Sequence, residues 1–264
     1  MSYNTILVER KDAVGIVRLN RPEKRNAMNA ELIDETVKAM QEFDVDPDVN
    51  VIVLVSTHPR VFCAGRDLDE GSSGTATDII KQREISSGPA RLFLAIRSLR
   101  KVVIAGVNGF ALAGGTGLAA WCDLVVAAED AVFGLPEANV GLFPSVVVPA
   151  LGYSTASVKK CLELILTGDR IDAQTAERMG LVNQIVPAEK LEEATMELAA
   201  KIAGKSPATL QVAKKTFYNM LNMEYSQATR YGAEITSILA VSEDGMEGQR
   251  AFLEKRQPKW RKLS

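Results

Sequence analysis

With 264 residues, of which 47% are hydrophobic and 24% charged, the chain has the size and composition of a globular protein with one large domain, or one domain and an appendage. Its 31 basic and 33 acidic residues leave a formal net charge of −2, which excludes a general electrostatic attraction to nucleic acid or to acidic membranes. No apolar run reaches the roughly 18 residues of a membrane span, and the start lacks the pattern of a secretory signal.

The cysteines and histidine restrict the chemistry further. Cys63, Cys122 and Cys161 show no CxxC spacing, so we expect reduced thiols in a cytoplasmic protein. The single histidine, His58, argues against a histidine-rich metal site, and we expect no bound metal. A Ser-His-Asp triad would need His58 as its base, and the chain lacks the GxSxG sequence that carries the serine of α/β-hydrolases.

The N-terminal elements are strands followed by a helix. Segments Ile6–Arg10 and Val14–Leu19 alternate in polarity and predict a β-hairpin. After a polar loop at positions 21–26, Asn29 has the side chain of a helix cap, and apolar residues then recur at helical spacing. The continuous apolar run Val51–Val55 predicts a strand buried on both faces.

The middle of the chain is predicted to contain another buried strand and two helices. The segment Glu70–Thr77 is rich in Gly, Ser and Thr and predicts a mobile loop. The spacing over Ile79–Leu99 predicts a long helix, interrupted or kinked at Gly88-Pro89. The apolar run Val102–Val107 predicts another buried strand, which leads through a glycine-rich turn into an apolar helix over Thr116–Trp121.

The rest of the chain begins with further strands and becomes entirely helical after Pro187. Strands are expected over Leu124–Ala128, Ala131–Phe133 and Leu181–Val186, with a loop over Gly134–Pro149. Helices are expected over Thr155–Leu166, Asp172–Met179, Ala188–Ala203, Pro207–Met220, Tyr225–Ala240 and about Glu247–Lys255. Strands and helices alternate up to about residue 186, which predicts an α/β core with a helical C-terminal region. We divide the two at residues 1–200 and 201–264.

Two glycine turns are candidates for binding negative charge. Ala64-Gly65-Arg66 comes after the strand Val51–Val55, and Ala113-Gly114-Gly115 comes after the strand Val102–Val107. Parallel strands ending in such turns would place two backbone N–H groups beside one cleft, and a developing oxyanion needs donors of this kind. Glycine turns also commonly follow strands for purely structural reasons, so either turn alone is weak support for an anion-binding site.

Glu137 is the candidate acid–base group. It lies in Leu135-Pro136-Glu137-Ala138, just after the strands that follow the second glycine turn. A lone carboxylate among apolar neighbours has a raised pKa and can take up and return a proton. The alternative is that Glu137 only occupies the first turn of a helix, where the helix dipole favours an acidic residue.

A dinucleotide-binding site is a competing interpretation. Gly115-Thr116-Gly117-Leu118-Ala119-Ala120 matches GxGxxA, and Glu129 lies near the end of the following strand. The context is poor because Asn108–Gly114 separates the motif from its strand, and two strand–helix units precede it. No GKS or GKT follows a glycine loop, which excludes a Walker A phosphate loop.

Several motifs in order resemble the crotonase superfamily, the enoyl-CoA hydratases and isomerases. They are Asn20-Arg21-Pro22 with Asn26-Ala27-Met28, Phe62 to Leu68, Val107-Asn108-Gly109 with Ala113-Gly114-Gly115, Cys122-Asp123, Pro136-Glu137, and Phe252 with Lys255-Arg256. The resemblance implies a ClpP-like spiral of ββα units in two roughly perpendicular sheets. It also implies C-terminal helices that form trimers, or hexamers built from two trimers. The ligand of this family is an acyl-CoA thioester.

By matching positions, the resemblance assigns site residues. The backbone N–H groups of Arg66 and Gly114 resemble the oxyanion hole of the family, and Glu137 its acid–base group. The positions that match coenzyme A contacts are Lys24, Arg25, Ala64, Asp67, Leu68, Phe252 and Lys255, the last two often reaching a neighbouring subunit in this family. Coenzyme A would arrive as part of the substrate, and no tightly bound cofactor is implied.

The departures from the hydratase pattern bear on the reaction. Hydratases of this family use two glutamates, and while the second matches Glu137, the first falls at Gly117. Ser145 stands after Phe143-Pro144 where hydratases tend to have Gly, and Val147-Val148 replaces the following Gly-Gly. Gly117, Ser145 and Phe143 are therefore expected in the site wall.

A single glutamate is the pattern of the Δ3-Δ2 enoyl-CoA isomerases, in which one base carries a proton from C2 to C4. The resemblance therefore favours double-bond isomerisation through Glu137. Two alternatives remain. One is a hydratase or another crotonase reaction with an altered acid–base set, using Ser145 or residues of Glu70–Glu84. The other is an acyl-CoA-binding protein with little catalysis.

Overall fold

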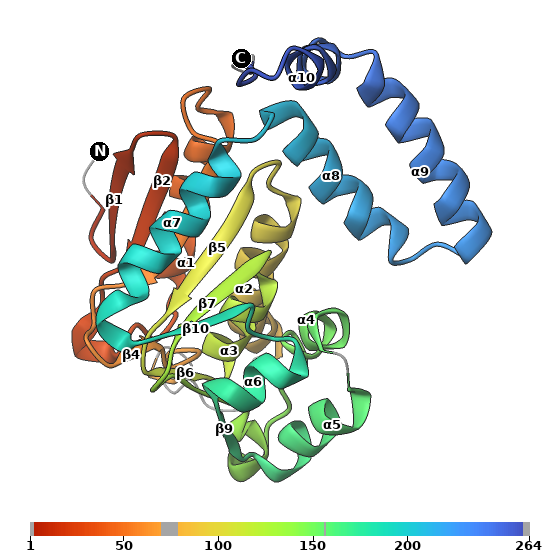
Figure 1. Ribbon diagram of the computed structural model, residues 1–264. Coiled ribbons are helices and arrows are strands. Elements are labelled where there is room, and N and C mark those ends of the chain that lie inside the picture. Colours follow the sequence, from red (N-terminus) through yellow and green to blue (C-terminus); the bar gives the residue numbers. More distant parts are fainter. Residues whose placement is uncertain (1–2, 70–78, 156, 261–264) are drawn as a thin grey trace.

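The computed structural model describes residues 3–69, 79–155 and 157–260, so the predicted mobile loop Glu70–Thr77 lies outside the described residues. Two sheets organise the chain (Figure 1). The larger sheet has the strands β1 (Ile6–Lys11), β2 (Val14–Leu19), β3 (Val51–Ser56), β5 (Val102–Val107), β7 (Leu124–Ala128) and β10 (Gln184–Val186), in that order. The smaller sheet has β4 (Val61–Cys63), β6 (Phe110–Leu112), β8 (Val132–Gly134) and β9 (Arg170–Asp172), in that order.

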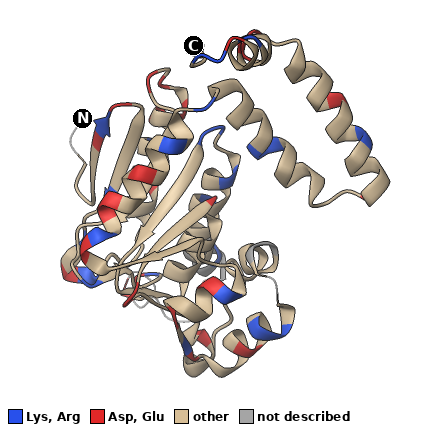
Figure 2. Ribbon diagram, in the orientation of Figure 1, with Lys and Arg blue, Asp and Glu red and all other residues tan. Residues whose placement is uncertain are grey.

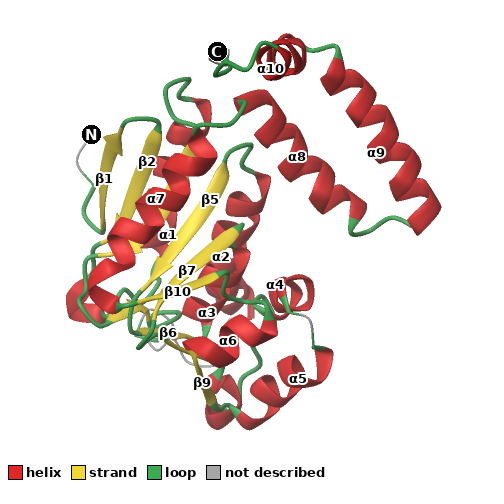
Figure 3. Cartoon of the chain, in the orientation of Figure 1, coloured by secondary structure: helices red, strands yellow, loops and turns green. Residues whose placement is uncertain are grey.

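The α-helices of the described residues are α1 (Ala30–Val45), α2 (Ile79–Ser98), α3 (Gly114–Trp121), α4 (Val148–Ser154), α5 (Val158–Thr167), α6 (Ala173–Met179), α7 (Leu191–Ala203), α8 (Pro207–Met220), α9 (Tyr225–Ala240) and α10 (Glu243–Leu253). Short 3₁₀ helices are η1 (Pro22–Lys24), η2 (Pro136–Val140) and η3 (Ala188–Lys190). Figure 3 shows how helices flank the strands.

The chain repeats one path through both sheets. A strand of the larger sheet is followed by a strand of the smaller sheet and then by a helix, first as β3-β4-α2 and then as β5-β6-α3. The next strand pair is β7 and β8. Neighbours in the larger sheet are parallel except for the β1–β2 hairpin, and β9 is the antiparallel edge of the smaller sheet. This is the expected spiral of ββα units.

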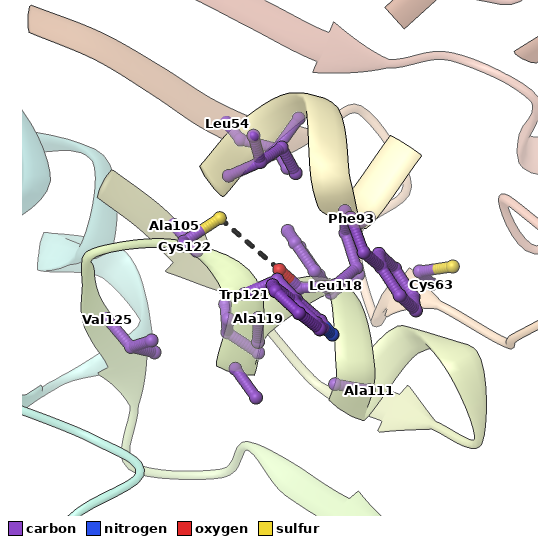
Figure 4. Close-up of a cluster of buried hydrophobic side chains, with 14 of the residues drawn as sticks. Leu54, Cys63, Phe93, Ala105, Ala111, Leu118, Ala119, Trp121, Cys122 and Val125 are labelled. Carbon is purple, nitrogen blue, oxygen red and sulfur yellow. Dashed lines mark hydrogen bonds between the residues drawn. The ribbon is translucent and has the colours of Figure 1, made fainter. Parts of the chain in front are cut away.

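Apolar residues on both faces of the larger sheet form the core. On one face, Val53 and Ile104 pack in a cluster with Leu191 and Ala194 of α7. On the other face, α1, α2 and α3 contribute to a larger cluster. Figure 4 shows part of it, with Phe93 of α2 beside Trp121 of α3; the two rings are 6.0 Å apart between centroids and stack at 15°. The continuous apolar runs of the sequence thus become strands covered on both faces.

Local signals placed several elements correctly. The hairpin forms as expected, and the Oδ1 of Asn29 accepts a hydrogen bond from the Leu32 amide at 3.0 Å, which caps α1. The long helix continues through Pro89 without the predicted interruption. The last helix begins at Glu243 rather than at Glu247, because Ser242 caps it through the Gly245 amide.

Three short strands were not predicted from the sequence. β4, β6 and β9 have only three residues each, too few for an alternating pattern, and their pairing is decided by tertiary contacts. β6 lies within the segment Asn108–Gly114 that was expected to be a turn. The expected loop Gly134–Pro149 contains η2 and the first residues of α4. The expected strand Leu181–Val186 is reduced to Gln184–Val186, and the helix expected from Thr155 begins at Val158.

The last three helices extend away from the sheets as an arm, which is here defined as α8–α10 (Figure 1). α9 has no buried residue, and the arm exposes large apolar side chains: Phe217, Tyr225, Ile238, Val241, Met246, Phe252 and Leu253. Charged residues are sparse along α9, which carries only Arg230 and Glu234 (Figure 2). α7, by contrast, packs on the larger sheet. The division between residues 1–200 and 201–264 remains a prediction.

Candidate active site

Three parallel strands of the smaller sheet end at one edge and bring the candidate residues together. β6 pairs in parallel with β4, where Ala111 is opposite Cys63, and with β8, where Leu112 is opposite Gly134. Arg66, Gly114 and Glu137 each follow the end of one of these strands by two or three residues. The glycine turns come after β3 and β5 along the chain, as expected, but the unpredicted short strands β4 and β6 lie between.

The Arg66 amide points away from its neighbouring chain segment. Met28 forms an isolated parallel bridge with Arg66, in which the Met28 amide donates to the Gly65 carbonyl at 2.7 Å. The Asp67 amide donates back to the Met28 carbonyl at 2.9 Å. Since successive amides of an extended segment point in opposite directions, the Arg66 N–H faces the other side. No hydrogen bond within the described residues uses it.

Gly114 presents a second amide on that side. It is the first residue of α3, so its N–H has no acceptor within the helix, and none is found among the described residues. A Cβ built on Gly114 would lie 3.7 Å from the Arg66 nitrogen but only 2.6 Å from Met28 Cε. Conversely, a Cβ built on Gly65 would lie 3.2 Å from the Gly114 nitrogen. The two amides are therefore close neighbours, and a side chain at position 114 would require the Met28 methyl group to move.

The backbone before Gly114 is held in a conformation that disfavours side chains. Ala113 has φ 53° and ψ −124°, although it carries a Cβ. Its amide donates to the Gly134 carbonyl at 2.8 Å, and Thr116 Oγ1 donates to the same carbonyl at 2.9 Å. These bonds hold the start of α3 against the end of β8, three residues before Glu137. The surrounding structure thus fixes the direction of the Gly114 amide.

Glu137 is a half-buried carboxylate with one unpartnered oxygen. It lies in the first turn of η2, and its buried Oε2 has no hydrogen-bond partner among the described residues. Burial raises the pKa of Glu137, because the charged form is poorly solvated there. Glu137 does occupy the first turn of a helix, as the structural alternative expected. A glutamate with only that role would have both oxygens hydrogen-bonded or exposed to solvent. A carboxylate of raised pKa with one unpartnered oxygen is suited to accept and return a proton.

The position of the missing glutamate is filled by apolar side chains. A Cβ built on Gly117 would lie 2.7 Å from Val147 Cγ2 and 3.1 Å from Phe93 Cζ. Val147 and Phe93 are both fully buried. Val147 is one of the residues that replace the Gly-Gly of hydratases. The two differences from the hydratase pattern, Gly117 and Val147, are therefore in contact with each other. Ser145 and Phe143, predicted in the wall, are exposed in this chain.

The loops beside the two amides carry paired and unpaired charges. Lys24 Nζ contacts Asp69 Oδ2 at 2.6 Å, and both side chains are largely exposed. Arg25 is exposed, and its guanidinium makes no hydrogen bond or ion pair with any described residue. The Ala64 amide donates to the Arg25 carbonyl at 3.1 Å, which keeps these two predicted coenzyme A contacts side by side. Leu68 is also exposed, at 56%.

Asp67 has a structural partner. Its Oδ2 accepts a hydrogen bond from Arg21 Nη1 at 2.5 Å, and Arg21 also donates to the Ala27 carbonyl. Burial opposes ionisation of Asp67, but the hydrogen bond and charge of Arg21 outweigh it and hold the pKa of Asp67 below its usual value. The Asp67 carboxylate therefore joins two loops of the site, and its contact with coenzyme A stays a prediction.

Phe252 and Lys255 lie at the end of the arm. Phe252 is 83% exposed, and Lys255 follows the end of α10. Figure 1 shows α10 far from α3 and β6, so neither residue reaches the site of its own chain. Met28 and Phe93 were not singled out as site residues from the sequence, whereas Val147 was noted there as a departure from the hydratase pattern.

Comparisons with known proteins are consistent with this geometry. The profile of the family described as enoyl-CoA hydratase/isomerase matches residues 9–263. A probable enoyl-CoA hydratase of Mycobacterium leprae (strain TN) is 37% identical over 265 residues, which are 98% of this chain and 99% of that protein. The chain belongs to the enoyl-CoA hydratase/isomerase family.

Other members of the family show the same relationship. The 2,3-dehydroadipyl-CoA hydratase of Escherichia coli (strain K12) is 33% identical over 258 residues, covering 96% of this chain and 97% of that protein. The crystal structure of an enoyl-CoA hydratase from Mycobacterium smegmatis has a TM-score of 0.92 and 31% identity, and the match covers 97% of this chain and 99% of that one. The crotonase fold is thereby confirmed.

The family assignment makes the dinucleotide alternative wrong. A Cβ built on Gly115 would lie 2.0 Å from the Cys63 carbonyl oxygen, so this glycine lets α3 pack against β4. Its small size serves packing rather than close approach of a phosphate. In the part of the chain that the structure describes, no cluster of three His, Cys, Asp or Glu residues could hold a metal ion. None of the described helices has the length and apolarity to cross a membrane.

Proposed function

We propose that this family member shifts the double bond of an unsaturated acyl-CoA thioester, with Glu137 as its only acid–base residue. The thioester oxygen binds between the N–H groups of Arg66 and Gly114. The Glu137 carboxylate removes a proton from C2 of a 3-enoyl-CoA, and the electrons move onto the thioester as an enolate. The same carboxyl group returns the proton to C4, leaving the double bond between C2 and C3. Each amide donor stabilises the enolate by about 3–4 kcal/mol, as in other oxyanion holes.

The filled space at Gly117 supports this reaction over hydration. Hydration requires a water molecule to be positioned and deprotonated beside C3 while a proton reaches C2, and the hydratase pattern uses two carboxylates for this. Here Val147 and Phe93 occupy the surroundings of Gly117. One unpaired carboxylate, Glu137, suffices for moving a proton along the acyl chain.

Hydration is the second candidate, because the relatives at 33–37% identity are named hydratases. A panel of 2-enoyl- and 3-enoyl-CoAs of varied length separates the two reactions. We expect the double-bond shift to exceed hydration, and Glu137→Gln to lower its kcat/KM by about 10²- to 10⁴-fold. The control is Glu189→Gln, which changes an exposed glutamate of η3 and leaves turnover unchanged.

The outcomes separate the candidate functions. Rapid hydration of crotonyl-CoA that depends on Glu137 would establish the hydratase and overturn the isomerase. Tight binding of acyl-CoA with no turnover of any substrate would instead indicate a binding protein. If the double-bond shift persists in Glu137→Gln, Glu137 is not the acid–base residue, although the role of the two amides would still stand.

We also propose that the arm joins three copies of the chain, or six as two trimers. The apolar residues that α8–α10 expose then become buried, and Phe252 and Lys255 reach the coenzyme A of a neighbouring subunit, beside Lys24 and Arg25. The basic loop suits the phosphates of coenzyme A.

The three cysteines are buried free thiols, which is compatible with the reducing cytoplasm where we place the protein.

A further inference from the structure

The guanidinium of Arg66 is left over by the proposed chemistry, which uses only the amide of this residue. Its Nη1 donates to Ser86 Oγ of α2 at 3.2 Å. Within the described residues it makes no other hydrogen bond and no ion pair. The two acids nearest in sequence are already paired, Asp67 with Arg21 and Asp69 with Lys24. Among the described residues, four of the five guanidinium N–H donors therefore have no acceptor and could bind a ligand.

The side chain of Arg66 lies along the face of α2 that borders the site. Ser86 precedes Phe93 by seven residues, which is two helical turns, so both project from the same face of α2. Phe93 marks one end of this face, against Gly117. The guanidinium is held at Ser86, about 10 Å further along the helix axis. Pro89 and Ala90, one turn before Phe93, are apolar. The face thus changes from apolar to cationic along its length.

We propose that Arg66 binds a carboxylate on the acyl chain, so that the preferred substrates are acyl-CoA thioesters that end in a carboxyl group. This inference rests on the proposed function, because it assumes a thioester held by the amides of Arg66 and Gly114. A guanidinium binds a carboxylate through two parallel hydrogen bonds. Because the Arg66 guanidinium has no ion pair among the described residues, an anionic chain would supply a charged acceptor that a neutral chain lacks.

A phosphate group of coenzyme A could bind the Arg66 guanidinium in the same way as an acyl carboxylate. A phosphate is common to every substrate, whereas an acyl carboxylate is present only in some, so matched substrates distinguish the two sources. The test compares two 3-enoyl-CoAs of six carbons, one with a terminal methyl group and one with a terminal carboxylate. The variants are Arg66→Met and Arg66→Lys, which keep the amide of residue 66, with Arg25→Met as the matched control.

We expect the wild type to prefer the carboxylated substrate. Arg66→Met should lower kcat/KM for that substrate by about 10- to 100-fold, the range of charge-assisted hydrogen bonds, and for the neutral one by less than about 3-fold. Arg66→Lys should retain part of the preference, because it keeps the charge but not the paired donors. Arg25→Met should affect both substrates equally. Thermal unfolding of each variant checks that the fold is retained.

Two results would overturn the inference. Equal losses on both substrates in Arg66→Met would assign the guanidinium to coenzyme A or to the enolate. Unchanged kinetics of Arg66→Met on both substrates would show that the guanidinium contacts neither of them. The proposed function is tested separately by Glu137→Gln on the same pair. If Glu137→Gln abolishes turnover while Arg66→Met shows no discrimination, only the inference about Arg66 fails. If Glu137→Gln leaves turnover intact, the proposed function fails.

Discussion

At the scale of single residues, the site depends on groups that the fold leaves unpaired. The amides of Arg66 and Gly114 have no acceptor within the described residues, and Oε2 of Glu137 has no donor. Leaving polar groups unpaired in a partly buried place costs free energy, so such groups concentrate where a ligand completes them. Their occurrence after three neighbouring strands is the strongest physical support for an active site at this edge of the smaller sheet.

The raised pKa of Glu137 predicts the pH dependence of the reaction. The base must be ionised to accept a proton, and burial raises its pKa above the 4.5 of an ordinary glutamate. Activity should therefore be full at higher pH and fall as the pH drops through this raised pKa. We expect the acid limb of the kcat/KM profile for a 3-enoyl-CoA to lie above pH 4.5 and to be absent from the residual activity of Glu137→Gln.

An acid limb at or below the value of an exposed glutamate would contradict this assignment. The folded state must be monitored across the same pH range, because acid unfolding would imitate a catalytic titration. Circular dichroism at each pH provides that control, and the profile is interpreted only where the signal is constant.

At the scale of elements, the packing of α3 against α2 and the start of α4 decides which chemistry is possible. Gly117→Glu places a Cβ 2.7 Å from Val147 Cγ2, so we expect a loss of about 1–3 kcal/mol in the free energy of unfolding. Gly117→Glu combined with Val147→Gly removes that contact and should recover part of the stability. The double variant should also gain hydration of crotonyl-CoA relative to the wild type, measured by loss of the enoyl absorbance.

The matched control adds the same side chain where there is room. A Cβ built on Gly152 of α4 meets nothing within 4 Å, so Gly152→Glu should leave stability and hydration unchanged. If Gly117→Glu proved as stable as Gly152→Glu, the site would be more open than the contacts with Val147 and Phe93 indicate. A double variant that folds but hydrates no faster would show that a second carboxylate is not the missing requirement.

A buried ion pair attaches the arm to the core. Lys214 of α8 lies 2.7 Å from Asp123, with side chains 5% and 10% exposed, and also donates to the carbonyls of Ile96 and Lys101. Lys214→Met leaves Asp123 buried with less compensation, and we expect it to cost about 3–5 kcal/mol in the free energy of unfolding. Lys215→Met, at the exposed neighbouring position, is the control and should change little in denaturant titrations. Similar losses for both would contradict a specific anchor.

At the scale of the whole molecule, the arm is an extended element that one chain cannot bury. α9 has no buried residue, and Ile238 and Val241 are 63% and 73% exposed. Large apolar side chains exposed in such number on one element are typical of an interface. We expect light scattering to give three or six times the 28.6 kDa of one chain. Ile238→Asp with Val241→Asp should shift the protein toward single chains, because charges would be buried in the interface.

The conservative pair Ile238→Leu and Val241→Leu keeps the apolar surface and should preserve the assembly. A wild type that remains a single chain at micromolar concentration would overturn the proposal, as would an aspartate variant of undiminished mass. In the monomeric variant, KM for acyl-CoA should also rise, because Phe252 and Lys255 no longer reach a neighbour. A lower mass without a change in KM would separate the arm from coenzyme A binding.

The sequence by itself determined the class of fold, the long helices and the continuous apolar strands, because these follow from local periodicity and capping. It also determined which residue types stand at the family's positions, including Gly117 and Glu137. Tertiary structure alone decided the rest. The three-residue strands β4 and β6 are too short to carry a pattern, yet their pairing places Arg66, Gly114 and Glu137 at one edge. Likewise, only packing shows that Val147 and Phe93 fill the space at Gly117, since contacts between distant segments leave no local signal.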